Sequence, residues 1–217
     1  MTNLKELHTK FSSITNLGRN DDDFLLQCIE DYLTVTKITK AELFQNVLKF
    51  KTTSPKFACL LGFLYHYGIG TEVNLEEMFR LYTISAENND PIGQAQLGRC
   101  YSDACGTEEN NEKAFYWAKK SAENGNLTGA YNLADCYCWG IGTPVIKRYS
   151  FYWYQRSAEA GMNCSVFWLA RCFRVGWGTN KDIHHALRLY RGIDHSSWMV
   201  EVKDVFKSSK LKGLHAM

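Results

Sequence analysis

Four glycine-containing segments are the first features of the sequence that could do chemistry. They are YHYGIGT from Tyr65, YSDACGT from Tyr101, YCWGIGT from Tyr137 and FRVGWGT from Phe173. A Gly-x-Gly sequence can cradle a phosphate when it follows a strand and is completed by a further lysine or glycine. The flanking residues supply neither feature. Because the segments recur every 36 residues, we interpret them as the turns of a structural repeat.

The eight cysteines could bind a metal or form disulfides. The pair that begins at Cys136 has one intervening residue and the pair that begins at Cys100 has four, so neither has the two-residue spacing of a zinc knuckle. Cys100, Cys136 and Cys172 instead share one repeat position, which Leu64 takes in the first copy. A position that accepts Cys or Leu is typical of an apolar core. We therefore predict buried, reduced thiols, no metal and no cofactor.

Catalysis needs a nucleophile, a base or a metal that converge in one pocket. The adjacent His184 and His185 lack the H-E-x-x-H spacing, and Cys105 is a lone thiol. The three aspartates of residues 21–23 could be metal ligands, but the capping of a helix is the simpler interpretation. The sequence therefore predicts a protein that is not an enzyme, with catalysis as a less favoured alternative.

Composition and charge narrow the class of protein further. The 25 Lys and Arg residues against 23 Asp and Glu residues give a formal net charge of +2, which argues against binding nucleic acid through bulk charge. The sequence contains no apolar run long enough to span a bilayer, and charges interrupt its N-terminus where a signal peptide would be apolar. We expect a cytoplasmic protein without nucleic-acid or membrane partners.

The 36-residue unit is predicted to contain two helices, which position the glycine segments between them. In the first copy, Ser54 and Pro55 suit the start of a helix, and Leu61, Gly62 and Tyr65 share one of its faces. Glycine or alanine at the position of Gly62 indicates that another helix crosses closely there. The equivalent small residues of the later copies are Gly98, Ala134 and Ala170.

The second run of each unit is amphipathic as well, with apolar residues at steps of three and four. In the first copy these residues are Met78, Phe79, Tyr82 and Ala86. Each unit is therefore a helical hairpin that cannot bury both of its faces alone, so neighbouring hairpins must stack. No segment has sustained period-two patterning, and we predict an all-helical chain.

The joint pattern LGRCYSDACGTEENNEKAFYWAKKSAENG, from Leu97 to Gly125, resembles the Sel-1-like repeat family, a relative of the tetratricopeptide repeats. The resemblance implies a right-handed α-solenoid of stacked helical hairpins whose members mostly act as adaptors and scaffolds, and it implies no catalytic residue. We divide the repeats into residues 54–89, 90–125, 126–161 and 162–197.

The flanking segments do not keep the repeat. Residues 1–53 are predicted to form an N-terminal helical segment of three helices, the third of which opens at Thr39. Residues 198–217 are predicted to form a C-terminal capping helix and tail. Helices followed by such repeats are similar to arrays that lie downstream of protein kinase domains. Because the kinase motifs are absent from this sequence, a kinase would be a partner or a former neighbour.

The resemblance implies a binding surface on the concave side, which is lined by the first helix of each repeat. The residues that we predict to line this groove are Gln96, Arg99, Asp103, Tyr131, Asn132, Asp135, Trp139, Phe167, Trp168, Arg171 and Arg174. Apolar residues of the first repeat, such as Leu60 and Phe63, would extend it. Such a mixture suits a peptide segment of a partner protein with an acidic or phosphorylated group at the two arginines.

Two alternatives to this groove stay open. The aromatic residues could pack between repeats while the arginines form a solvated rim. The chain could also be a structural or self-associating unit without a dedicated ligand.

Overall fold

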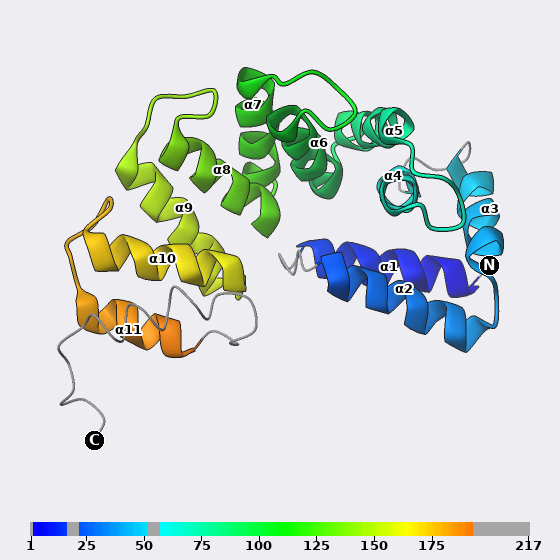
Figure 1. The fold of residues 1–217 in the computed structure, drawn as a ribbon, viewed down its shortest axis with the longest axis horizontal. Helices are drawn as coiled ribbons and strands as arrows, with labels where there is room; N and C mark the ends of the chain where they lie inside the picture. Colours follow the sequence, from blue (N-terminus) through cyan, green and yellow to red (C-terminus); the bar gives the residue numbers. More distant parts are fainter. Residues whose placement is uncertain (1, 17–21, 52–56, 193–217) are drawn as a thin grey trace.

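The computed structural model of the protein describes residues 2–16, 22–51 and 57–192, and within these ranges it contains helices and no strand (Figure 1). The helices are α1 (Thr2–Asn16), α2 (Asp22–Thr36), α3 (Lys40–Lys51), α4 (Ala58–Tyr67), α5 (Leu75–Glu87), α6 (Pro91–Asp103), α7 (Asn111–Glu123), α8 (Leu127–Trp139), α9 (Lys147–Glu159), α10 (Asn163–Val175) and α11 (Ile183–Arg191). The predicted all-helical repeat fold is confirmed.

Helices α4 to α11 form four consecutive hairpins. Each hairpin pairs an even-numbered first helix with the odd-numbered second helix that follows it, and each second helix also packs on the first helix of the next hairpin as far as α10. The hairpins follow one another in an arc (Figure 1). We call the side formed by the first helices α4, α6, α8 and α10, on which α1 packs, the concave face.

The turns between the two helices of a hairpin explain the recurring glycines. Gly140 ends α8 in the left-handed conformation, with φ of 76°, and its N–H donates to the carbonyl of Cys136 at 2.9 Å. Two residues on, Gly142 lies against the preceding hairpin, where an added Cβ would be 2.0 Å from the carbonyl oxygen of Asn111. Ala104 replaces glycine in the second turn but keeps the left-handed conformation, with φ of 54°.

The predicted close crossing within each hairpin is confirmed at the small residue of the first helix. A Cβ added to Gly62 would lie 2.6 Å from the ring of Tyr82, which is buried between the helices. Tyr154 and Tyr190 occupy the same position of the second helix in the third and fourth hairpins and are buried too. In the second hairpin this position holds Ala118.

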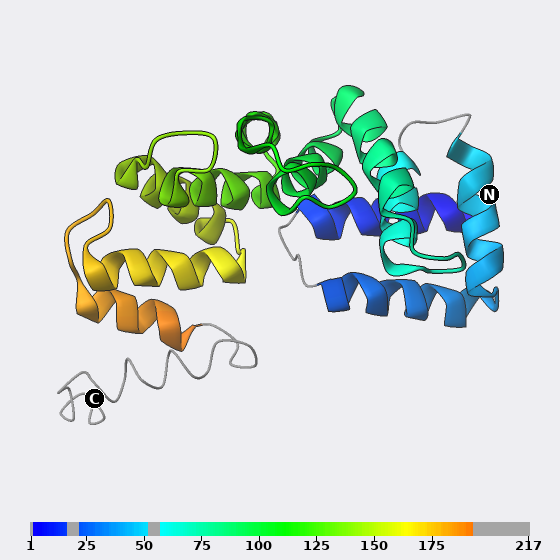
Figure 2. The ribbon, with the colours of Figure 1, turned by 45° about the horizontal axis from the view of Figure 1, so that its top comes forward.

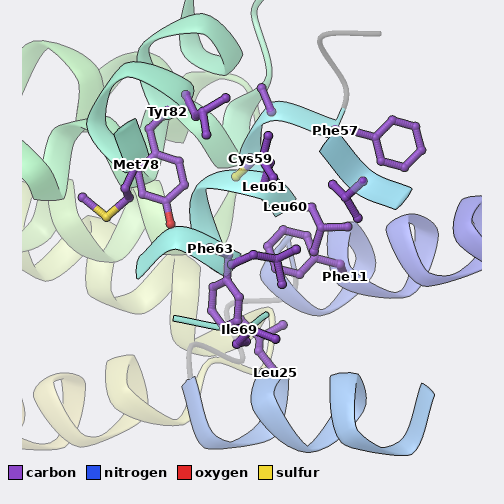
Figure 3. Packing of buried hydrophobic residues seen from close by; sticks show 14 of the residues in the cluster. Phe11, Leu25, Phe57, Cys59, Leu60, Leu61, Phe63, Ile69, Met78 and Tyr82 are labelled. Carbon is purple, nitrogen blue, oxygen red and sulfur yellow. The ribbon is translucent and has the colours of Figure 1, made fainter. Parts of the chain in front are cut away.

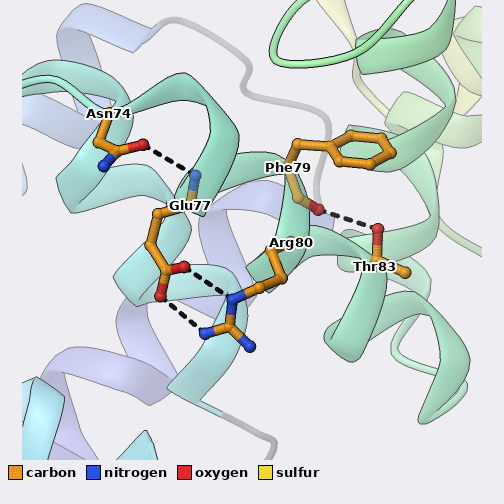
Figure 4. Close-up of polar contacts among 5 residues, drawn as sticks. All are labelled: Asn74, Glu77, Phe79, Arg80 and Thr83. Atoms are coloured by element: carbon orange, nitrogen blue, oxygen red, sulfur yellow. Dashed lines mark hydrogen bonds and ion pairs between the residues drawn. The ribbon is translucent and has the colours of Figure 1, made fainter.

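Polar caps start most of the second helices. The Asn74 side chain accepts a hydrogen bond from the Glu77 N–H at 2.9 Å, while the Glu77 carboxylate holds Arg80 in a two-point ion pair at 2.7 Å (Figure 4). The Thr83 hydroxyl donates to the Phe79 carbonyl one turn away. The Asn74 contact satisfies one of the backbone N–H groups that a helix start leaves free.

Helix α1 covers the concave face of the first hairpin. Its apolar residues Leu4, Leu7 and Phe11 are buried in one cluster with residues of α4 (Figure 3). The rings of Phe11 and Phe63 meet edge to face with centroids 5.5 Å apart. Helix α1 also contacts α6 and α8, and both views place it beside α4 to α6 (Figures 1 and 2). This part of the predicted groove is therefore occupied by the chain itself.

Helix α3 takes the place of the second helix of a hairpin, although it lies before the predicted repeats. Phe44 packs edge to face on Tyr65, with centroids 5.2 Å apart, as Phe79 packs on Tyr101 at 5.4 Å. Gly70 lies against the carbonyl of Lys40 in α3. In the same way, Gly142 of the third hairpin lies against the carbonyl of Asn111 in α7. The first hairpin thus meets on α3 the kind of surface that the later hairpins meet on α5, α7 and α9.

Two predictions concern residues outside the described ranges. They are the helix start at Ser54 and Pro55, and the capping helix of residues 198–217.

Candidate functional site

Three pockets follow one another along the concave face, each between two consecutive first helices. The α4/α6 pocket has a volume of about 360 Å³, the α6/α8 pocket about 190 Å³ and the α8/α10 pocket about 270 Å³. They are equivalent by the repeat, because Arg99, Asp135 and Arg171 occupy the same position of α6, α8 and α10. The pockets share one architecture but carry different side chains.

The α8/α10 pocket brings together four of the predicted residues: Trp139, Trp168, Arg171 and Arg174. Trp139 is 58% exposed, and its ring meets that of Trp168 edge to face with centroids 5.8 Å apart. Trp168 in turn stacks on Tyr154, which comes from α9, at 5.9 Å. The tryptophans thus form an apolar wall whose outer member faces solvent.

A cation lies against this wall. The Arg171 guanidinium is 4.9 Å from the centre of the Trp168 ring, within the range of a cation–π contact. Arg171 makes no ion pair with any carboxylate of the described ranges. Arg174 lines the same pocket one helical turn further on. The pocket therefore combines apolar surface with two positive charges at its edge.

The α6/α8 pocket has the opposite character. Arg99, Asp103, Asn132 and Asp135 line it, and Arg99 pairs with Asp103 at 3.8 Å. Asp135 accepts a hydrogen bond from the Tyr154 hydroxyl. Burial raises the pKa of Asp135 to about 6, although hydrogen bonds from Tyr154 and Tyr131 act to lower it. At neutral pH the pocket thus carries two carboxylates and one guanidinium.

The α4/α6 pocket collects the remaining predicted residues. Gln96, Arg99 and Asp103 line it together with His66 and Tyr82. Arg99 and Asp103 lie on the ridge between this pocket and the next and contribute to both. The partly buried Tyr131, also predicted, lines the α6/α8 pocket, and burial raises its pKa.

The assignment of Phe167 to the groove is wrong. Its side chain is 1% exposed and packs on Tyr190 with ring centroids 5.7 Å apart. The position is part of the hairpin core, because its equivalents Ala95 and Tyr131 are buried or partly buried as well. Leu60 and Phe63 are also buried, beneath α1. For these residues the alternative of packing between helices is correct.

The α8/α10 pocket also has lining residues that were not predicted for the groove, among them the aromatic Tyr154 and Trp177. Tyr154 comes from the second helix, and Trp177 lies between the two glycines of the last turn, where Lys147 places its ammonium 4.4 Å from the ring centre. The repeat position of Tyr154, opposite the small residue Ala134, is a signal that could have identified it.

The described residues contain no cluster of three or more side chains suited to hold a metal ion. Cys100, Cys136 and Cys172 are buried as predicted, and burial raises the pKa of each thiol to about 12. All eight cysteines are free thiols. Thiols with such high pKa values are protonated at neutral pH and are poor nucleophiles. Among the described helices, none has the length and apolar character needed to cross a membrane.

Comparison with known proteins adds a family and two similar structures. The model of the Sel1 repeat matches residues 55–90, 91–126, 128–162 and 165–191. The crystal structure of a Sel1 repeat protein from Oxalobacter formigenes aligns with a TM-score of 0.64 at 23% identity, over 70% of this chain and 62% of that one.

The crystal structure of a protective antigen from uropathogenic Escherichia coli strains, which displays an SLR fold, aligns with a TM-score of 0.62 at 27% identity. That alignment covers 69% of this chain and 33% of the antigen. The chain therefore spans less than two thirds of the length of either protein. No curated protein matches the sequence.

Proposed function

The chain belongs to the Sel1 repeat family, whose members are generally protein-interaction scaffolds, and from this premise we propose that it is a non-enzymatic adaptor. Its concave face binds a peptide segment of a partner protein, and the α8/α10 pocket is the centre of the contact. The observation that carries this proposal is the exposed Trp139 beside Trp168 and Arg171. Tryptophan and arginine are among the residue types that dominate binding energy in protein interfaces.

The two arginines favour an acidic or phosphorylated group in that segment. Arg171 and Arg174 are three residues apart on one helix and line the same pocket, so both guanidinium groups can reach one anion. A guanidinium binds a carboxylate or phosphate through two parallel hydrogen bonds. A phosphorylated segment would place the partner in a signalling or kinase-linked complex.

The packing of helix α1 on the concave face of its own chain supports the proposal. It is an amphipathic segment of this chain that lies on the concave face of the first hairpin with three apolar residues buried against it. The concave face of this array therefore accepts a helical segment with apolar anchors.

Self-association is a second candidate function, and a different surface favours it. Tyr116, Tyr149 and Tyr152 of the second helices α7 and α9 are each at least half exposed. Tyrosine is enriched in interfaces between proteins. A contact between copies through these residues would leave the concave face free.

The test uses two groove variants, Trp168→Ala and Arg171→Ala combined with Arg174→Ala, in quantitative partner capture from lysate. The matched control is Tyr116→Ala combined with Tyr152→Ala. We expect both groove variants to recover much less of the same partners at unchanged helicity, and the arginine effect to be greater at low salt. Equal recovery with the groove variants would refute the proposal. A mass that rises with concentration, and that the control variant abolishes, would establish the second candidate.

A further inference from the structure

The second hairpin lacks an aromatic side chain that the other three hairpins have. Tyr82, Tyr154 and Tyr190 lie at one repeat position, between the first and second helix of their hairpins, and are at most 2% exposed. The second hairpin has Ala118 at this position, and the small residue Gly98 of α6 lies opposite. Both Gly98 and Ala118 border the α6/α8 pocket.

The missing ring gives the α6/α8 pocket an apolar floor. Gly98, Ala114 and Ala118 line the bottom of its volume of about 190 Å³, and Cys136 and Ile141 line its side. In the neighbouring α8/α10 pocket the ring of Tyr154 stands where Ala118 lies. An apolar cavity of about 150 Å³ is large enough to hold a benzene ring, so the α6/α8 pocket has room for one large apolar side chain.

The rim of this pocket is acidic. Asp103 pairs with Arg99 of the same helix at the rim, and the carboxyl of Asp135 lies deeper, where Tyr154 donates a hydrogen bond to it. The two carboxylates outnumber the single guanidinium. One repeat further along the concave face, Arg171 and Arg174 give the α8/α10 pocket positive charge instead. A segment that crosses both pockets therefore meets negative charge at one and positive charge at the other.

We propose that the α6/α8 pocket binds an apolar side chain of the partner segment, aromatic or large aliphatic, next to a lysine or arginine that pairs with the exposed Asp103. The acidic or phosphorylated group of the same segment then reaches Arg171 and Arg174. The two pockets lie one repeat apart along the concave face. This inference rests on the proposed function and extends it, since it specifies which residue types of the partner segment the groove binds.

The experiment selects from a library of random 12-residue peptides displayed on phage. Three proteins serve as bait: the parent chain, Ala118→Tyr, and Arg171→Ala combined with Arg174→Ala. From the parent we expect peptides that combine an apolar residue and a neighbouring Lys or Arg with an Asp or Glu elsewhere in the peptide. Ala118→Tyr restores the ring of the other hairpins and fills the pocket. It should bind the selected peptides at least tenfold more weakly in fluorescence polarisation, with a melting temperature no lower than that of the parent.

A second variant tests the same inference if Ala118→Tyr does not fold. Asp103→Lys changes an exposed side chain at the rim and should abolish the preference for Lys or Arg while keeping that for the apolar residue. If the parent selects no peptide, the proposed function fails. If peptides depend on Arg171 and Arg174 but bind both pocket variants as well as the parent, the proposed function stands and this inference is overturned.

Discussion

At the scale of single residues, the most strained backbone position of the repeats is Ala104. It caps α6 in the left-handed conformation that Gly68, Gly140 and Gly176 adopt at the other three turns. An alanine there costs about 1 kcal/mol or more relative to glycine, because its Cβ crowds the following carbonyl. The turn is kept because the hydrogen bond to the Cys100 carbonyl and the packing around it outweigh that strain.

We expect Ala104→Gly to raise the free energy of unfolding by about 1 kcal/mol, because it removes this strain. The measurement is chemical denaturation of the full chain. Ala158→Gly is the matched control, since Ala158 lies within α9 and glycine there should lower stability by a similar amount. A loss of stability with Ala104→Gly would show that the turn is not strained.

Asp135 links stability to pH. Its folded-state pKa of about 6 lies above the ordinary value near 4, so the folded chain binds the proton more tightly than the unfolded chain does. The stabilisation from that proton is fully present below about pH 4 and is lost as the pH rises through about 6. Above pH 6, the folded state carries a charge that burial disfavours.

Asp135→Asn removes this charge but keeps an oxygen that can accept the Tyr154 hydroxyl. We expect the variant to be more stable than the parent by about 1–3 kcal/mol at pH 7.5 and to match it near pH 4. Denaturant unfolding at the two pH values tests this. A difference that is the same at both pH values would mean that the carboxyl is not the cause.

At the scale of helices, the sequence predicted the hairpin helices better than the roles of the N-terminal helices. Asp90 and Asn126, the repeat equivalents of the predicted cap Ser54, cap α6 and α8, because capping depends only on neighbouring residues. The role of α3 was missed, although Thr39 and Glu42 form a capping box and Phe44 follows at the spacing of Phe79 after Asn74. No Gly-x-Gly turn precedes α3, so the strongest repeat signal was absent.

The position of α1 could not be predicted in the same way. Its apolar spacing indicates a buried face but contains nothing that names the surface it contacts. The prediction of groove residues was limited in the same way. Phe167 and Trp168 are neighbours in sequence, and only the burial of their side chains distinguishes the core residue from the pocket residue.

A double-mutant cycle tests whether α1 packs on the concave face. Phe11→Ala and Phe63→Ala should each lower the free energy of unfolding by about 3 kcal/mol, and the pair should couple by about 0.5–1.5 kcal/mol because their rings are in contact. Phe11 with Phe115, which belongs to a separate core cluster, is the control pair and should be additive. Additive effects for Phe11 and Phe63 would place α1 elsewhere.

At the scale of the whole molecule, the array has unequal ends. In a stacked repeat each hairpin is stabilised by its neighbours. The first hairpin lies between α3 and α6 and is covered by α1, whereas the main described neighbour of α11 is α10. Helix α7 lies between α6 and α8.

This asymmetry predicts the order in which the array opens. We expect amides of α11 to exchange with solvent at least tenfold faster than those of α7 in native-state hydrogen exchange, because a terminal helix can separate by losing one interface while α7 must lose two. Amides of α4 should stay close to those of α7, since α1 and α3 protect the first hairpin. Trp168→Ala, which weakens the core between α9 and α10, should speed exchange in α10 and α11 and leave α4 unchanged. Equal protection of α11 and α7 would contradict this order.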